Sequence, residues 1–142
     1  MTIAAILQSK GHEVLTVDCA TPVRVAVTLL AERKIGAVPV LRGGEVAGIM
    51  SERDIIYCLR TEGAAALDRP VEAIMTAPAI TVEPGAEILG ALSLMTRRRI
   101  RHLPVVDGGA LVGLVSIGDL VKFRMDKIEA EAEAMLNYIQ SV

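Results

Sequence analysis

Aromatic side chains are nearly absent from this chain of 142 residues, which contains one Phe, two Tyr and no Trp. Proteins that hold single-stranded nucleic acid stack its bases on such rings. The net charge also argues against a nucleic-acid-binding protein. With 15 Lys and Arg against 17 Asp and Glu it is -2, so the chain has no broad basic surface. We therefore expect nucleic acid not to be the partner. A basic cluster between positions 97 and 102 is nevertheless compatible with a local anion-binding site.

No apolar stretch approaches the roughly 18 to 20 residues that a membrane-spanning helix needs. Charged residues or Pro interrupt each stretch. The N-terminus also lacks the basic flank and apolar run of an export signal. These absences predict a soluble, cytoplasmic protein that makes no contact with a membrane.

Residues that hold metals or perform catalysis are scarce, since the chain has only two Cys and two His. Four clustered metal ligands cannot be found, and neither HExxH nor GxSxG occurs. Cys19 and Cys58 lie in apolar surroundings, which predicts two buried free thiols and no disulfide framework. We accordingly expect no metal, no catalytic residue and no enzymatic activity.

Aliphatic residues are abundant, with a hydrophobic fraction of 52% and a mean hydropathy of +0.48, enough for a folded core. The chain is organised as an internal repeat with an offset of 65 residues, which aligns Asp54 with Asp119. The ungapped match pairs 16–56 with 81–121, and 12 of the 41 positions are identical, among them a Pro, a Gly-Gly pair, a Ser and an Asp. Chance similarity would not preserve these residue types together, so we infer a duplication.

Each repeat is expected to fold as strand, helix, strand, strand, helix, which makes an α+β unit. β-rich runs at 15–17 and 80–82 precede windows whose apolar residues recur every three or four positions. A Gly-Gly pair then joins two apolar runs, which predicts hairpins over 37–50 and 103–115, and helical patterning resumes at 55–60 and 120–124. Neither unit buries both faces of its sheet alone, so we expect a pseudo-twofold pair packed through its sheets, with one cleft per repeat.

Three segments outside the repeats are also predicted to be helical: 3–8, 71–75 and the tail from 123 to 139. The tail is amphipathic, with an apolar stripe made of Ile128, Ala132, Met135, Leu136 and Ile139. Such a stripe packs either on its own domain or on a partner subunit, and both alternatives stay open here. We divide the chain into 1–64, the first repeat with the N-terminal helix, 65–124, the second repeat, and 125–142, the C-terminal helix.

Ser51 with Asp54 and Ser116 with Asp119 have the spacing of a helix capping box, with Ser at the N-cap and an acid three residues later. Capping alone would explain both pairs. A helix N-terminus at the mouth of a cleft, however, offers free N–H groups and a positive dipole end to an anion. A carboxylate there can accept both hydroxyls of a ribose, so ligand binding is the second interpretation.

The repeated pattern resembles a tandem pair of CBS domains, the Bateman module. The resemblance rests on Val-Pro-Val at 38–40, on Leu-Pro-Val-Val-Asp at 103–107, and on Gly-x-x-Ser-x-x-Asp at 48–54 and 113–119, and it covers residues 12–124. It implies binding of adenosine-containing ligands, such as AMP, ADP, ATP, S-adenosylmethionine or NAD, in the clefts between the repeats. We expect AMP first, as a regulatory ligand and not as a catalytic cofactor.

The resemblance also implies roles for individual residues. In that family the Asp of Ser/Thr-x-x-Asp holds the ribose hydroxyls, which here would be Asp54 and Asp119, with Ser51 and Ser116 near the ribose or phosphate. Backbone near the first strand and before the hairpin Pro would frame the adenine, which implies Thr16, Val17, Ala37, Val38, Ile80, Thr81, His102 and Leu103.

The two clefts are not expected to be equal. Basic residues at the positions of Arg101 and His102 contact phosphates in some members of the family, whereas the first repeat has Gly36 and Ala37 there. Arg53 of the first repeat, in turn, stands where the second repeat has Gly. We therefore expect the second cleft, with Asp119, Arg101 and His102, to hold the tighter-bound nucleotide.

The sequence thus predicts a stand-alone regulatory module that senses adenine nucleotides and signals to an unknown protein. The alternative is a dimerisation scaffold with empty clefts. In either case we expect a homodimer, because helix faces rich in Leu, Ile, Val and Met would stay uncovered in a monomer.

Overall fold

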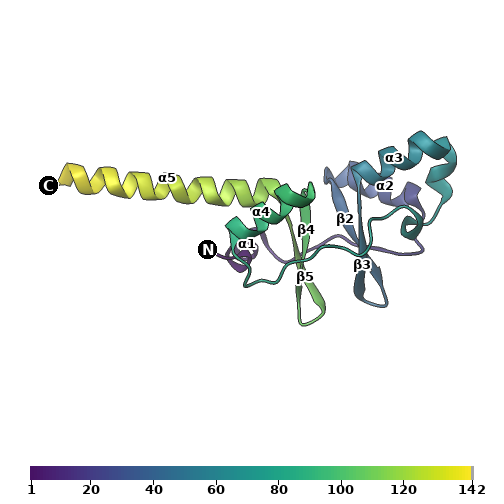
Figure 1. The fold of residues 1–142 in the computed structure, drawn as a ribbon, viewed down its shortest axis with the longest axis horizontal. Coiled ribbons are helices and arrows are strands. Elements are labelled where there is room, and N and C mark those ends of the chain that lie inside the picture. The colour runs from purple at the N-terminus through teal and green to yellow at the C-terminus, as the bar shows by residue number, and fades with distance from the viewer. Residues whose placement is uncertain (142) are drawn as a thin grey trace.

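The computed structural model describes residues 1–141, which form two similar α+β halves side by side and one long helix that projects from them (Figure 1). The first half contains β1 (Val17–Asp18), α2 (Val23–Arg33), β2 (Ala37–Arg42), β3 (Glu45–Ser51) and α3 (Glu52–Glu62). The second contains α4 (Ile88–Arg98), β4 (His102–Asp107), β5 (Ala110–Ser116) and the start of α5 (Ile117–Ser141). The halves meet through β3 and β5, which confirms the expected pair of repeats packed through their sheets.

The duplication is visible in backbone details that recur 65 residues apart. Lys34 and Arg99 end α2 and α4 in the left-handed conformation, each with φ of 54°. Both hairpins turn through a Gly-Gly pair with positive φ, as the turn requires, and both carry a register shift at the same place in the strand. The repeat in the sequence therefore encodes the same local backbone twice.

The first strand of the second repeat is shorter than predicted. In the first sheet, with order β1-β2-β3, β1 runs parallel to β2, and Cys19 N–H donates to Leu41 O. The second sheet is only the pair β4-β5, and the predicted run 80–82 forms one isolated bridge between Val82 and Val105. Cys19 corresponds to Pro84, which has no N–H, so the next hydrogen bond of this ladder cannot form in the second repeat.

Each core is completed by a segment from outside its repeat. The N-terminal helix α1 (Ile3–Lys10) packs Ile3, Ile6 and Leu7 into the core of the second half. The connector contains two short 3₁₀ helices, η1 (Gly63–Asp68) and η2 (Val71–Ala73), and Val71 is buried in the core of the first half. The predicted helix at 3–8 forms, whereas the helix predicted at 71–75 is only the three-residue 3₁₀ turn η2.

The repeated glycines Gly48 and Gly113 permit these crossings. A Cβ at Gly113 would lie 2.6 Å from Leu7 Cδ2, and a Cβ at Gly48 would lie 2.7 Å from the backbone oxygen of Thr76. Both positions therefore need glycine for close approach of a neighbouring segment.

The tail is the continuation of α5, which runs without a break from Ile117 to Ser141 through position 124/125. It contacts α1, α4 and β5 near its start, where Leu120 is buried, and every residue from Met125 to Ser141 is exposed. Of the two alternatives left open for the stripe, the structure does not show packing on its own domain. The boundaries at 64/65 and 124/125 themselves stay predictions.

Two further expectations concern the cysteines and the membrane. Cys19 is buried and free as predicted, but Cys58 is only half-buried because it lies on the outer part of α3, where its thiol donates to Glu62. Among the helices of residues 1–141, none has both the length and the apolar composition needed to cross a membrane.

The position of α1 gives a stability prediction. Leu7→Ala should lower the free energy of unfolding by about 2 to 5 kcal/mol, because it removes a fully buried side chain and leaves a cavity. Urea denaturation monitored by circular dichroism measures the change. Glu32→Ala is the control, since Glu32 is exposed on α2, away from the apolar helix faces, and should change stability by no more than about 0.5 kcal/mol. Equal effects of the two changes would contradict the packing described here.

Candidate functional site

A cavity of about 660 Å³ lies between the two halves. Its walls come from the first half, the connector and the second half: Gly36, Ala37, Ile49, Ser51 to Asp54, Ile56, Thr76, Ile80, Arg99 to His102 and Ser116 to Gly118. The N-terminal ends of α3 and α5 both reach it, because Ser51 and Ser116 precede these helices. The volume lies within the range of small-molecule sites.

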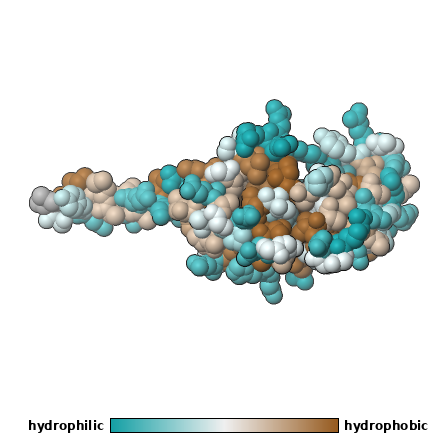
Figure 2. Space-filling model, turned by 60° about the horizontal axis from the view of Figure 1, so that its bottom comes forward, coloured by the Kyte–Doolittle hydropathy of each residue, from teal (hydrophilic) through white to brown (hydrophobic). Residues whose placement is uncertain are grey.

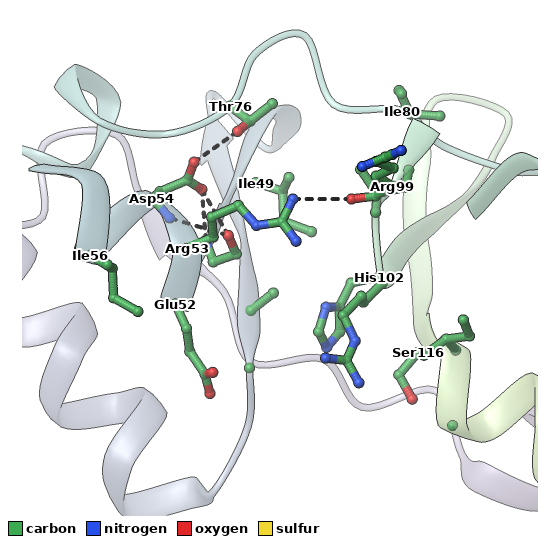
Figure 3. A pocket seen from close by; sticks show the side chains of 17 residues that line it. Ile49, Glu52, Arg53, Asp54, Ile56, Thr76, Ile80, Arg99, His102 and Ser116 are labelled. Carbon is green, nitrogen blue, oxygen red and sulfur yellow. Dashed lines mark hydrogen bonds between the residues drawn. The ribbon is translucent and has the colours of Figure 1, made fainter. Parts of the chain in front are cut away.

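Asp54 is held in a fixed position on the first wall (Figure 3). Its Oδ2 accepts Ser51 N–H at 2.8 Å, and its own N–H donates to Ser51 Oγ at 3.4 Å, which together form a capping box at the α3 N-terminus. The Ser51 hydroxyl also lies 3.1 Å from Oδ2. Asp54 Oδ1 accepts a hydrogen bond from Thr76 Oγ1 of the connector at 2.9 Å. Capping is therefore real, and the same bonds aim the carboxylate at the cavity.

Positive groups gather in the same cavity. Its lining includes the guanidinium groups of Arg53, Arg99 and Arg101, against the carboxylates of Glu52 and Asp54. Arg53 Nη1 reaches across to the backbone oxygen of Arg99 at 3.2 Å, so this contact connects α3 to the end of α4 (Figure 3). Together with two helix N-termini, this charge balance favours an anionic ligand.

His102 is packed closely in the wall. A Cβ at Gly36 would lie 3.1 Å from the imidazole Cε1, so only glycine leaves the ring this much room. Burial lowers the pKa of His102 below its usual value, and the charges of Arg101 and Lys10 lower it further. Its surroundings thus favour the neutral ring over the imidazolium.

The structure brings together eight of the predicted site residues in this cavity: Ala37, Ser51, Arg53, Asp54, Ile80, Arg101, His102 and Ser116. Val17, Val38 and Leu103 are instead buried in the two cores. Thr16 and Thr81 lie next to the first strands outside the cavity lining, with Thr81 exposed. Arg101 and His102 share the cavity with Asp54, whereas we had expected them to serve the cleft of Asp119.

Asp119 has a different environment from Asp54. Its Oδ2 accepts Ser116 N–H at 2.8 Å, and the ammonium of Lys10 lies 2.6 Å from the same oxygen. Burial alone would raise the pKa of Asp119, but the hydrogen bonds from Lys10 and Ser116 outweigh it and hold the pKa below its usual value. Asp119 is therefore a paired carboxylate outside the lining of the cavity.

Sequence reasoning missed Thr76 and Lys10. Both lie outside the matched segments, in the stretch that precedes each repeat, so the internal alignment carried no signal for them. Ile49 and Thr76 form a bridge between β3 and the connector, which only the tertiary structure defines.

Comparison with known proteins identifies the family of this chain. The CBS domain model matches residues 9–61 and 71–126, which together cover most of the chain. The chain belongs to the CBS-domain family. Its two repeats are therefore two CBS domains, as the resemblance implied.

Individual relatives extend over nearly the whole chain. The mitochondrial CBS domain-containing protein CBSX3 of Arabidopsis thaliana is 35% identical over 98% of this chain and 72% of its own. A solved structure of a putative signal-transduction protein with CBS domains from Burkholderia ambifaria is 42% identical, with a TM-score of 0.83 over 89% of this chain and 95% of that one. The crystal structure of CBSX2 in complex with AMP is 25% identical, with a TM-score of 0.72 over 82% and 90% of the two chains.

The environment of His102 predicts a dependence of stability on pH. Below the ordinary histidine pKa of 6.5, the unfolded chain takes up a proton that the native ring resists, so stability falls as pH falls through this range. In His102→Asn, the free energy of unfolding should therefore fall less steeply as the pH is lowered from 7 to 5.5. Urea denaturation at each pH measures this slope. Above pH 7.5 both proteins carry a neutral side chain and their curves should run parallel. Identical slopes below pH 7 would contradict the assigned environment.

Proposed function

We propose that the chain is a cytoplasmic, stand-alone regulatory module that binds an adenosine-containing ligand in the cavity between its repeats. The ligand classes are AMP, ADP, ATP and NAD, with AMP first. The observation that carries the proposal is the meeting of a fixed carboxylate, Asp54, with three guanidinium groups and two helix N-termini in one cavity. Nucleotide binding would report the energy or nucleotide state to a partner protein of unknown identity.

Each part of a nucleotide has a counterpart in the lining. Asp54 would accept the ribose hydroxyls, because a carboxylate offers several acceptor positions and bonds from Ser51 and Thr76 occupy only some of them. The phosphate would lie against Arg101, His102 and the N-terminus of α5. The adenine would fill the apolar part of the cavity, which Ile49, Ile80 and Ile100 line.

The AMP complex of CBSX2 supports this proposal, since that protein binds AMP and shares the fold. A second candidate function is a dimerisation scaffold, which the exposed apolar side chains favour. Ile56 and Tyr57 on α3 and Leu89 on α4 are 63%, 62% and 57% exposed, as is typical of helix faces that a partner covers. We propose a homodimer in either case.

Titration calorimetry with AMP and adenosine tests the site. Arg101→Ala should weaken AMP binding about ten- to a hundredfold, the loss expected for one charge-assisted hydrogen bond. It should leave adenosine binding unchanged, because adenosine has no phosphate. Asp54→Ala should weaken both ligands, since both have the ribose hydroxyls.

Asp107→Ala is the matched control, because this exposed carboxylate lies at the end of β4 outside the cavity lining. Thermal denaturation of Asp54→Ala checks that the variant folds, since the lost capping box costs about 0.5 to 2 kcal/mol. Failure of the wild-type chain to bind any adenosine compound would refute the sensor and favour the scaffold.

A further inference from the structure

The two repeats treat their capping carboxylates differently. In the first repeat, Thr76 donates its backbone N–H to Ile49 O at 2.9 Å and its hydroxyl to Asp54 Oδ1 at 2.9 Å. Ile49 and Asp54 correspond in the alignment to Leu114 and Asp119. In the second repeat, Lys10 Nζ alone donates to both equivalents, to Leu114 O at 2.7 Å and to Asp119 Oδ2 at 2.6 Å. The equivalent pair of acceptors is thus bonded in both repeats by one residue from outside the repeat, Thr76 in the first and Lys10 in the second.

The chemical difference between these residues is charge. Thr76 presents a neutral hydroxyl, which bonds Asp54 without cancelling its negative charge. Lys10 presents an ammonium that pairs with Asp119 Oδ2 and neutralises the charge of this carboxylate. Asp119 is only 27% exposed, so a ligand hydroxyl would have to replace a partly buried ion pair.

The position of Lys10 is set by the fold. Lys10 is the last residue of α1, and Ile3, Ile6 and Leu7 of the same helix are buried in the second core. The C-terminal end of a helix also favours a cation. The ammonium is therefore held beside Asp119 by a rigid element.

We propose that Lys10 is a built-in occupant of the second nucleotide position, so that the chain binds one adenosine-type ligand, through Asp54, and keeps the Asp119 position closed. This inference rests on the proposed function. It makes Lys10 the residue that sets the number of ligands per chain.

Titration calorimetry of the full chain with AMP tests the number of sites. The wild-type chain should bind one AMP, and Lys10→Thr, which copies Thr76, should bind two. Lys10→Thr combined with Asp119→Ala should return to one. Lys127→Thr is the matched control, since Lys127 is exposed on the projecting part of α5 and should leave one site.

The outcomes separate this inference from the proposed function. Two equal sites in the wild-type chain, or one site in Lys10→Thr, would overturn the role of Lys10 while the sensor stands. Absence of AMP binding in every variant would overturn both. As a readout without ligand, the Asp119 carboxyl followed by NMR should titrate at a higher pH in Lys10→Thr, and an unchanged titration would also overturn the proposal.

A second surface is identified by an independent observation on α5. Its exposed apolar residues recur at alternating spacings of four and three, which is the heptad pattern of a coiled coil: Val121, Met125, Ile128, Ala132, Met135 and Ile139. The helix projects away from the body (Figure 1), and the space-filling view shows apolar residues along it (Figure 2). No residue of the described chain from Met125 onward is covered.

The flanking charges fit a second copy in parallel. With Met125 at position a and Ile128 at position d, Arg124 is at position g and Glu129 at position e of the following heptad. In a parallel pair, position g of one helix lies beside that position e of the other, so Arg124 lies opposite Glu129 of the other copy. An antiparallel pair with full overlap would instead place Glu129 and Glu131 against their own counterparts. We infer that two copies of this chain associate through α5 as a parallel two-stranded coiled coil.

Sedimentation and cross-linking test this surface. Ile128→Glu should shift the full chain from dimer to monomer at tens of micromolar, whereas Lys127→Glu, one position away and off the stripe, should leave the dimer intact. In a Cys58→Ser background, Met125→Cys should oxidise to a disulfide-linked dimer, since this position meets itself only in a parallel pair. A dimer that survives Ile128→Glu, or a Met125→Cys variant that does not cross-link, would overturn the inference.

Discussion

The structure depends on the exchange of segments between two cores that are each too small to close alone. A sheet of two or three short strands with two helices leaves apolar residues uncovered. The second core is completed by α1, with Leu7 against Gly113, and the first core by the connector around Val71. The halves are therefore joined by more than the contact of β3 with β5, and the segments that join them also reach the site.

The same exchange makes the two capping carboxylates unequal. The connector crosses β3 at Ile49 and brings Thr76 to Asp54, while α1 ends beside β5 and brings Lys10 to Asp119. A duplication preserves the residues inside the repeats, but the segment before the first repeat is an N-terminal helix and the segment before the second is a connector. The difference between hydroxyl and ammonium at these two places decides which carboxylate remains available.

Much of this was predictable from the sequence, and the rest was not for identifiable reasons. The repeat predicted both hairpins, their Gly-Gly turns and the helices that begin after Ser51 and Ser116, because these features depend on local residues. The apolar pattern also predicted a strand at 80–82, where only one bridge forms. Pro84 lacks the N–H that would extend the ladder, and the apolar pattern does not reveal this. Sequence reasoning assigned Arg101 and His102 to the cleft of Asp119, and the structure shows that both also line the cavity that contains Asp54.

The sequence by itself determined the duplicated α+β unit, its capping boxes and the heptad stripe of the tail, since each is a pattern of neighbouring residues that favours one local structure. Only the tertiary structure decided that α5 is continuous and projects, that the cavity combines groups from both repeats, and that Lys10 pairs with Asp119. The cavity and the ion pair depend on contacts between residues far apart in the sequence, with a separation of 46 for Arg53 and Arg99 and of 109 for Lys10 and Asp119. No local pattern encodes such a contact, because it forms only when the two cores close around their exchanged segments.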